Sequence, residues 1–340
     1  MLDGFTERFS ANAVVASAIR TALGSTGESG VMARPIVVGY DSTAGDEAPV
    51  EFGIAAAQFT GARLIVCAVH ASPAALGAYG ASVVEDQLPD GPGESLDHLG
   101  KELRGQGVTA ECRSLPGTSA PRALHEAAEE FGAGLLVVGS TDRGAVGRSL
   151  LGSTGHRLTH GAPCPIAIVP HSWQRGGGLA TIGVAYVDTP EGHRALDDAI
   201  ALAQRSGAKL RILHAAKSRG LSGSFGGGDA MTPAVRYEEL ASAVRVRAER
   251  AVEDATAGQT GVDVETDVSI GDPADFLIAA SEHLDLLVCG SRGYGPARAV
   301  LLGGVSRRIV TGAHCPVIVL TRGAETGLEA LLDQQVGASA

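Results

Sequence analysis

Two glycine-rich segments contain the residues best suited to binding a phosphate group. Each begins with a glycine directly after an apolar run, passes through a short loop and ends with small residues that open a helical stretch. The segments hold Gly139, Gly144, Gly152, Ser153 and Thr154, and then Gly290, Gly293, Gly303, Gly304, Val305 and Ser306. Glycine lets a backbone approach a phosphate closely, and the unpaired N–H groups at a helix start attract an anion. The pattern predicts a phosphate-binding loop, although Gly139 and Gly290 also fit plain turns that end a strand.

Other polar residues follow apolar runs at corresponding places. Asp41 and Asp188 each end such a run, where a carboxylate can contact a ligand or cap the next helix, and both interpretations stay open. His70 and His214 also end apolar runs, but no second ligand at metal spacing accompanies either of them. We interpret both histidines as structural.

The chain shows none of the residue patterns typical of an enzyme or a structural metal site. It has no HExxH motif, no paired carboxylates and no nucleophile with a base placed beside it by sequence. Its five cysteines form no CxxC pair, which argues against a disulfide framework or a zinc site. We therefore expect a binding protein and no enzyme.

The glycine-rich segments belong to an internal repeat. Residues 135–169 and 286–320 align without a gap at an offset of 151, and residues 35–49 match 182–196 at an offset of 147, which sets Asp41 opposite Asp188. We predict two domains, at 34–170 and 181–322, joined by a Gly-rich linker at 171–180. Residues 1–33 form an extension that we expect to be flexible, and 323–340 form a tail.

Within each unit, short β-branched runs alternate with longer Ala-rich stretches of helical character. Strands are predicted at 35–40, 63–70, 108–113, 134–139 and 164–169, and at 181–187, 208–214, 262–268, 284–289 and 315–320. Helices are predicted at 46–60, 93–106, 119–131 and 149–161, and at 190–206, 233–257, 273–283 and 302–312. Runs that are apolar on both faces indicate buried parallel sheets. The fold class is α/β, with two tandem doubly wound, Rossmann-like domains of five parallel strands each.

With these motifs in place, the chain resembles the universal stress protein family. That family has an ATP-binding pattern, Gly-x2-Gly-x9-Gly-Ser/Thr, after strand four, an aspartate at the end of strand one near the adenine, and a Cys-Pro that opens the last strand. The resemblance covers 35–170 and 180–321, and it implies that ATP or a related adenine nucleotide, with or without Mg²⁺, binds each unit. The residues it implicates are Gly39, Tyr40, Asp41, Ala71, Val138, Gly139, Arg143, Gly144, Gly152, Ser153 and Thr154, and then Asp188, Ala215, Cys289, Gly290, Gly293, Gly303, Gly304, Val305 and Ser306.

Each unit departs from the family pattern at one position. Asp142 stands at the second glycine position of the first unit, where its carboxylate would repel a triphosphate. Gly304 stands at the Ser/Thr position of the second unit and removes one hydroxyl donor. Because a like charge costs more than a lost donor, we expect the second unit to bind slightly better.

Homodimers of the family pair their last strand across a twofold axis. The resemblance therefore implies that 164–170 and 315–321 pack together about a pseudo-twofold axis, as an intrachain pseudo-dimer that could dimerise further.

Composition restricts the partners. The net charge of −11 argues against the broad basic face that nucleic-acid binding needs, and no apolar run approaches the roughly 20 residues of a membrane span. We expect a cytoplasmic adenine-nucleotide-binding protein that acts as a stress- or dormancy-linked sensor, with an unknown protein partner. The alternatives are a nucleotide-free protein that acts through protein contacts, and a weak nucleotide hydrolase.

Overall fold

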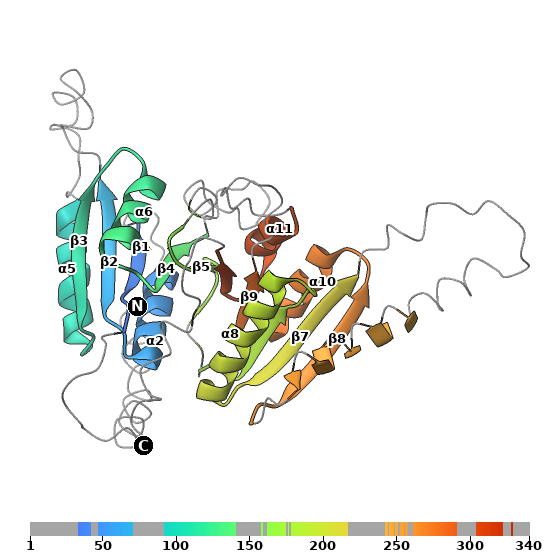
Figure 1. Ribbon diagram of the computed structural model, residues 1–340. Coiled ribbons are helices and arrows are strands. Elements are labelled where there is room, and N and C mark those ends of the chain that lie inside the picture. Colours follow the sequence, from blue (N-terminus) through green and yellow to red (C-terminus); the bar gives the residue numbers. More distant parts are fainter. Residues whose placement is uncertain are drawn as a thin grey trace, which may run out of the picture.

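The strands form one continuous ten-stranded sheet in the order β3-β2-β1-β4-β5-β10-β9-β6-β7-β8 (Figure 1). The computed structural model describes residues 33–41, 47–70, 92–140, 158, 162–174, 176, 178–216, 242–257 except 244, 248, 251 and 255, 261–290, 304–321 and 328. The first half of the sheet consists of β1 (Ile36–Tyr40), β2 (Leu64–His70), β3 (Ala110–Pro116), β4 (Leu135–Gly139) and β5 (Ile166–Val169). The second half consists of β6 (Thr181–Ala185), β7 (Lys209–Ala216), β8 (Val264–Ile270), β9 (Leu286–Gly290) and β10 (Val317–Leu320).

Each half has the doubly wound topology predicted from the repeat. Strand order runs 3-2-1-4-5 in the first unit and 8-7-6-9-10 in the second, so it reverses between β1 and β4 and again between β6 and β9. All pairs within a unit are parallel. Ligands of such sheets bind outside the carboxyl ends of the strands at the reversal. We call the carboxyl ends of β1 and β4 the first switch point, and those of β6 and β9 the second.

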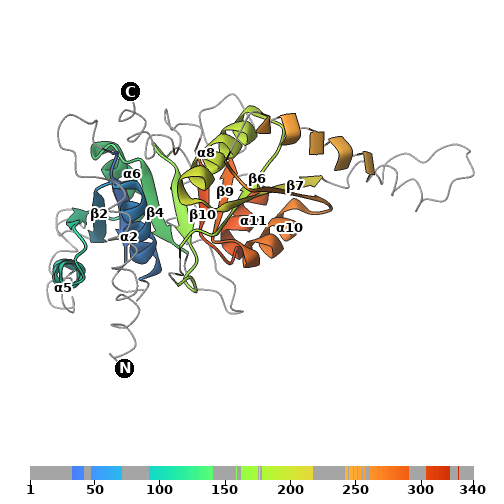
Figure 2. The ribbon, with the colours of Figure 1, turned by 90° about the horizontal axis from the view of Figure 1, so that it is seen from below.

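The two units join through β5 and β10, which confirms the predicted pairing of the last strands. The pair is antiparallel, with Ile168 opposite Val317, Ala167 opposite Ile318 and Ile166 opposite Val319. Ala167 and Ile318 are equivalent in the repeat, so a local pseudo-twofold axis passes through their pair. Seen from below, β4 and β10 lie in the middle of the molecule between the helices of the two units (Figure 2).

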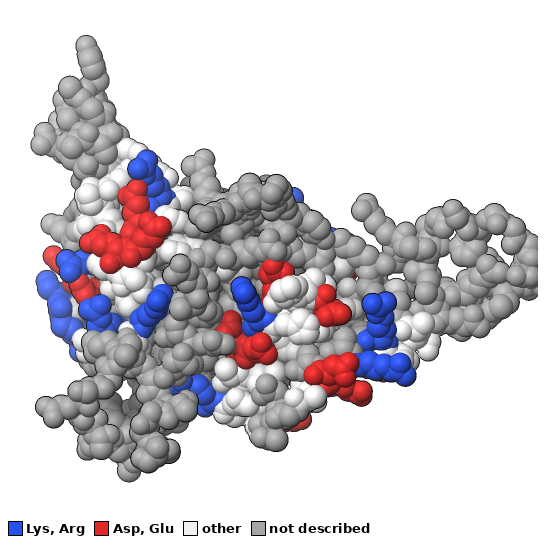
Figure 3. All heavy atoms as spheres, viewed as in Figure 1, with Lys and Arg blue, Asp and Glu red and all other residues white. Residues whose placement is uncertain are grey.

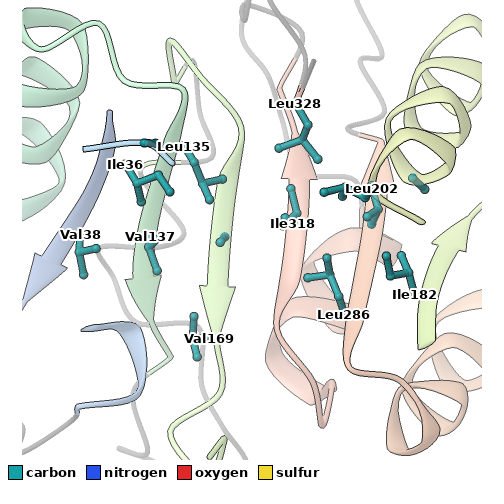
Figure 4. Close-up of a cluster of buried hydrophobic side chains, with 14 of the residues drawn as sticks. Ile36, Val38, Leu135, Val137, Val169, Ile182, Leu202, Leu286, Ile318 and Leu328 are labelled. Atoms are coloured by element: carbon teal, nitrogen blue, oxygen red, sulfur yellow. The ribbon is translucent and has the colours of Figure 1, made fainter. Parts of the chain in front are cut away.

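Helices cover both faces of the sheet. They are α2 (Ala48–Thr60), α5 (Pro92–Gly105), α6 (Ala120–Glu130), α8 (Pro190–Ser206), α10 (Pro273–Ala280), the short η2 (Ser281–His283) and α11 (Gly304–Gly312), with further helical turns at 242–256. Each face has one apolar cluster, and both clusters contain residues from both units. Figure 4 shows the cluster shared by α2 and α8, in which Val169 of β5 and Ile318 of β10 flank the seam.

Segments outside the two repeats contribute to this shared core. Leu328 of the tail is 2 % exposed and packs with Ile318 and Leu202 in the cluster of Figure 4. Trp173 of the linker meets Phe52 of α2 edge-on, with ring centroids 5.7 Å apart. Thr321 is buried at the seam and donates a hydrogen bond to the carbonyl oxygens of Ala162 (3.2 Å) and Cys164 (3.0 Å). The two units therefore share the apolar cluster on each face of the sheet.

Five strands begin two residues later than predicted: β5, β9, β10 and the edge strands β3 and β8. β3 starts at Ala110 instead of 108, because the Val108 amide donates to the carbonyl of Leu103 (2.8 Å) and ends α5. β8 likewise starts at Val264 instead of 262. The predicted helix at 149–161 lies outside the described residues apart from Leu158, which is buried and helical.

Strand register corrects the alignment of the two units by one residue. Ile36 pairs with Leu135, and Ile182 pairs with Leu286, so the offset in this part of the repeat is 146 and not 147. Tyr40 is then equivalent to Tyr186, and Asp188 lies one residue further along the chain than Asp41.

The same register separates the two histidines. Leu64 and Leu210 are equivalent, so His70 corresponds to Ala216 and His214 to Ala68. Ala215 lies inside β7, opposite Ser269, and corresponds to Val69 and not to Ala71.

Candidate nucleotide-binding site

The first switch point brings together Tyr40, Asp41 and Gly139, as the sequence predicted. Because β1 and β4 pair in parallel, the carboxyl ends of both strands lie next to each other at the same end of the sheet. Asp41 is exposed there, while Tyr40 and Gly139 are half-buried. Ser140, which follows Gly139, is buried: its amide donates to the Val169 carbonyl (2.8 Å), and its Oγ accepts from the His171 amide (3.2 Å). Ser140 therefore holds the end of β4 against the end of β5.

Acidic groups surround the Tyr40 hydroxyl. Burial raises the pKa of Tyr40, and the carboxylates of Glu47, Glu102 and Asp41 raise it further, in that order. These residues come from three segments: the N-cap of α2, α5 and the end of β1. Burial and these three carboxylates thus favour the protonated form of Tyr40 at the first switch point.

The second switch point contains an aromatic and histidine cluster that the motif search did not identify. Tyr186 is only 1 % exposed, and its ring lies edge-on to His193, with centroids 5.6 Å apart, and tilted to His214 at 6.3 Å. The His193 Nε2 lies 3.1 Å from Oδ1 of Asp188. Within the described part of the chain, the Tyr186 hydroxyl is a buried polar atom without a hydrogen-bond partner. Two tyrosines at equivalent positions were the signal that could have revealed this cluster.

His214 supports this cluster from β7. Its Nδ1 lies 3.2 Å from the Tyr186 carbonyl oxygen. Burial lowers the pKa of His214, and the hydrogen bond to Tyr186 and the charge of Asp188 offset that effect only in part. The neutral form of His214 is therefore favoured, which agrees with a structural role.

Two glycines assigned to the ligand also lie in close contact with a neighbouring helix, Gly290 with its backbone and Gly39 with a flexible leucine side chain. A Cβ on Gly290 would lie 2.9 Å from the carbonyl oxygen of Glu191, in the first turn of α8. A Cβ on Gly39 would lie 2.8 Å from Cδ1 of Leu124 in α6. Both contacts are tighter than ordinary van der Waals distances, so part of the glycine pattern reflects helix packing.

The start of α11 is held against α10. Gly304 is exposed, with no atom near the position of a Cβ, whereas Ser306 is buried and Val305 packs on the core. Arg308 lies one turn further along α11 and pairs with Asp272 (2.7 Å) and with Asp275. Asp272 also caps α10, and hydrogen bonding, led by the Asp275 amide, lowers its pKa. These two ion pairs of Arg308 thus hold α11 against the N-terminus of α10.

Both units match known proteins in sequence. The model of the universal stress protein family matches the chain twice, at residues 32–170 and 179–321. The chain belongs to the universal stress protein family. A universal stress protein of Mycolicibacterium smegmatis is 30 % identical over 298 residues, covering 84 % of this chain and 96 % of that protein. One from Mycobacterium tuberculosis is 32 % identical over 196 residues, covering 54 % of this chain and 61 % of its own.

Solved structures agree on the fold. A universal stress protein from Archaeoglobus fulgidus superposes with a TM-score of 0.60 at 19 % identity, covering 86 % of this chain and all of that one. A likeness at this identity supports the tandem arrangement and the topology of the sheet.

The described part of this universal stress protein contains only some of the predicted site. Val138 and Cys289 are buried at the penultimate positions of β4 and β9, and both side chains belong to the apolar core. The predicted residues that lie outside the described part are Ala71, Arg143, Gly144, Gly152, Ser153, Thr154, Gly293 and Gly303, and Asp142 lies there too.

The described residues hold no group of three or more His, Cys, Asp or Glu side chains that could bind a metal. Their helices include none with the length and apolarity of a membrane span. On the face in Figure 3, the described acidic and basic side chains are interspersed.

Proposed function

We propose that this universal stress protein binds ATP or a related adenine nucleotide at a switch point of its sheet and acts as a stress- or dormancy-linked regulator. One observation supports the proposal: strand order reverses between β1 and β4 and again between β6 and β9, and Asp41 follows β1 at the first reversal while Asp188 follows β6 at the second. The glycine-rich segments follow those same two strands in the sequence.

The described residues suit an adenine nucleotide in their chemistry. Asp41 and Asp188 are exposed carboxylates that can accept a hydrogen bond from an exocyclic amine. Gly304 opens α11 with an exposed backbone, and the N-terminus of a helix favours a phosphate. We propose that the protein binds the nucleotide without a dedicated catalytic group.

Nucleotide-free action through protein contacts is the second candidate. The close approach of Glu191 to Gly290 favours it, because packing alone then explains why a glycine ends β9. Gly304 also stands where the family's nucleotide-binding pattern has a Ser or Thr. These two features weaken the case that the glycine-rich pattern of the second unit serves a ligand.

Isothermal titration of the full chain with ATP, and with CTP as the matched control, separates these functions. The proposal predicts saturable binding of ATP that exceeds CTP binding by at least about tenfold. It also predicts weaker ATP binding when Asp41 and Asp188 are both replaced by alanine. No binding of ATP would favour the nucleotide-free function, and equal binding of both nucleotides would contradict recognition of the adenine base. ATP turnover well above background would favour the weak hydrolase.

A further inference from the structure

The seam between β5 and β10 has a symmetric backbone. The two residues that face each other at its centre, Ala167 and Ile318, are equivalent in the repeat, because Ala167 pairs with Val137 of β4 and Ile318 with Val288 of β9. Two copies of β5, or two copies of β10, could therefore form the same antiparallel ladder. Backbone hydrogen bonds do not explain why the first unit pairs with the second, so the preference must come from side chains.

The centre of the seam sets a small side chain against a large one. Ala167 and Ile318 are both buried in the same apolar cluster, and directly opposed residues of an antiparallel pair have Cβ atoms about 4.5–5.5 Å apart. Two first units would place alanine opposite alanine and leave a cavity. Two second units would press isoleucine against isoleucine and overpack the same space. The central position is filled to the normal extent only when unlike units meet.

Thr321, which follows β10, adds a hydrogen bond from the second unit to the first. Its hydroxyl donates to the carbonyl oxygens of Ala162 (3.2 Å) and Cys164 (3.0 Å), which precede β5. The equivalent residue after β5 is Pro170, whose side chain has no hydrogen-bond donor. A pair of first units would therefore lose this side-chain hydrogen bond on both sides of the axis.

The helices beside the seam make a third contact between unlike residues. The guanidinium of Arg205 in α8 lies over the ring of Phe59 in α2, 6.0 Å from the ring centroid. The register offset of 146 makes these two residues equivalent, and both helices end two residues later at a left-handed glycine, Gly61 or Gly207. A like pair would bring together two phenylalanines or two arginines, so this cation–π contact would be lost.

We infer that the seam is a heterotypic interface, in which the first unit recognises the second unit and rejects a second copy of itself. The central pair of Ala167 and Ile318 is its main specificity determinant, and Thr321 contributes to it. The partner that fits an unpaired last strand is the opposite unit, from the same chain or from a second copy of this chain. Association through this strand therefore closes a single chain or exchanges units between two chains, and it forms no pair of like units. This specificity does not depend on nucleotide binding.

A full chain that can be cut in its linker tests the inference. A protease site is inserted after Gly176, because no atom of the described residues lies within 4 Å of its Cβ position. Unlabelled and isotope-labelled cut chains are mixed, allowed to exchange units in dilute urea and returned to native buffer, and native mass spectrometry then identifies the pairs. We expect exchanged pairs of one first and one second unit, with fewer than about one pair in ten made of like units.

Random pairing would make about half of all pairs like with like. A fraction near that value, or separation of the cut chain into single units, would overturn the inference. This measurement uses the wild-type units, so it decides the matter even where a variant does not fold.

Variants of the cut chain then test the two determinants, with the affinity of the units measured by dilution in analytical ultracentrifugation. Ala167→Ile should weaken the pairing of unlike units by at least about fivefold, because it places isoleucine against isoleucine. Adding Ile318→Ala exchanges the small and large side chains across the axis and should restore most of the lost affinity. Unchanged affinity in Ala167→Ile, or a double variant no tighter than the single one, would overturn the role of the central pair.

Thr321→Val should weaken the pairing by about fivefold or more, because it removes the only side-chain hydrogen bond described here across the seam. Thr311→Val is the matched control, since the Thr311 hydroxyl donates to carbonyl oxygens of its own helix, those of Arg307 and Arg308. The control should leave the affinity unchanged. Equal effects of the two variants would overturn the role of Thr321.

Discussion

Replacing Gly290 with alanine separates the packing role of this glycine from a role in ligand binding. The new Cβ would lie 2.9 Å from the Glu191 carbonyl oxygen, whereas ordinary contacts lie at 3.4–4 Å, so α8 or β9 must move by about half an ångström. The first turn of α8 has little room to yield, because a Cβ on Gly192 would overlap the Val187 carbonyl. Overpacking of this kind costs about 1–3 kcal/mol.

The assay is thermal unfolding of the ligand-free full chain, followed by far-UV circular dichroism. We expect Gly290→Ala to lower the midpoint by at least about 2 °C. Gly304→Ala is the matched control, because no atom of the described residues lies within 4 Å of its Cβ position and alanine is the better helix former. Its midpoint should equal or exceed that of the wild type.

An unchanged midpoint for Gly290→Ala would refute the packing argument. If ATP affinity fell at the same time, the glycine at the end of β9 would be there for the ligand. A variant that loses both stability and affinity would support the packing argument and would show that a side chain at this position cannot serve as a selective block of the second switch point.

Three further predictions concern the core and its titratable groups. Leu328→Ala should lower the free energy of unfolding in urea by about 2–4 kcal/mol, because Leu328 is 2 % exposed in the shared core, and a change below about 0.5 kcal/mol would contradict its burial there. At pH 8, Cys112 should react faster with a disulfide reagent than any other thiol of the native chain, because it is only partly buried, whereas the other four are buried and burial raises their pKa values to about 12; burial raises the pKa of Cys112 as well, so its reaction should be slower than that of a free thiol. Rapid reaction of a second thiol would count against this. Because the pKa of His214 is below 6.5 in the folded state, the unfolded chain takes up this proton first, and stability should fall as pH drops through 6.5. His214→Gln should make that fall less steep, and an identical slope would show that His214 does not contribute.

Much of the fold could be predicted from the sequence, because buried parallel strands consist of uninterrupted apolar runs. The runs that became β4 and β9 were placed within one or two residues, and the repeat identified the strands that pair at the seam. The edge strands β3 and β8 were harder, since their residues are only partly buried or exposed and nearby helix ends compete for their amides. Val108 shows this competition directly.

The candidate site was predicted less completely for two physical reasons. Aligning the two units on Asp41 and Asp188 hides a shift of one residue between them. Only the hydrogen-bonded register of the strands shows that Asp188 lies one residue beyond the position equivalent to Asp41. The contact of Gly290 with Glu191 depends on how α8 docks on the sheet, which no local pattern encodes. The histidine at 193 was missed because it belongs to no motif.

The most direct test of the account is mass spectrometry of the small molecules released when the purified full chain is denatured. The account predicts an adenine nucleotide, ATP or a close relative, at about one per chain. Purified protein that releases no nucleotide, and that also fails to take up ATP when it is supplied in excess, would contradict the claim that this universal stress protein binds adenine nucleotides.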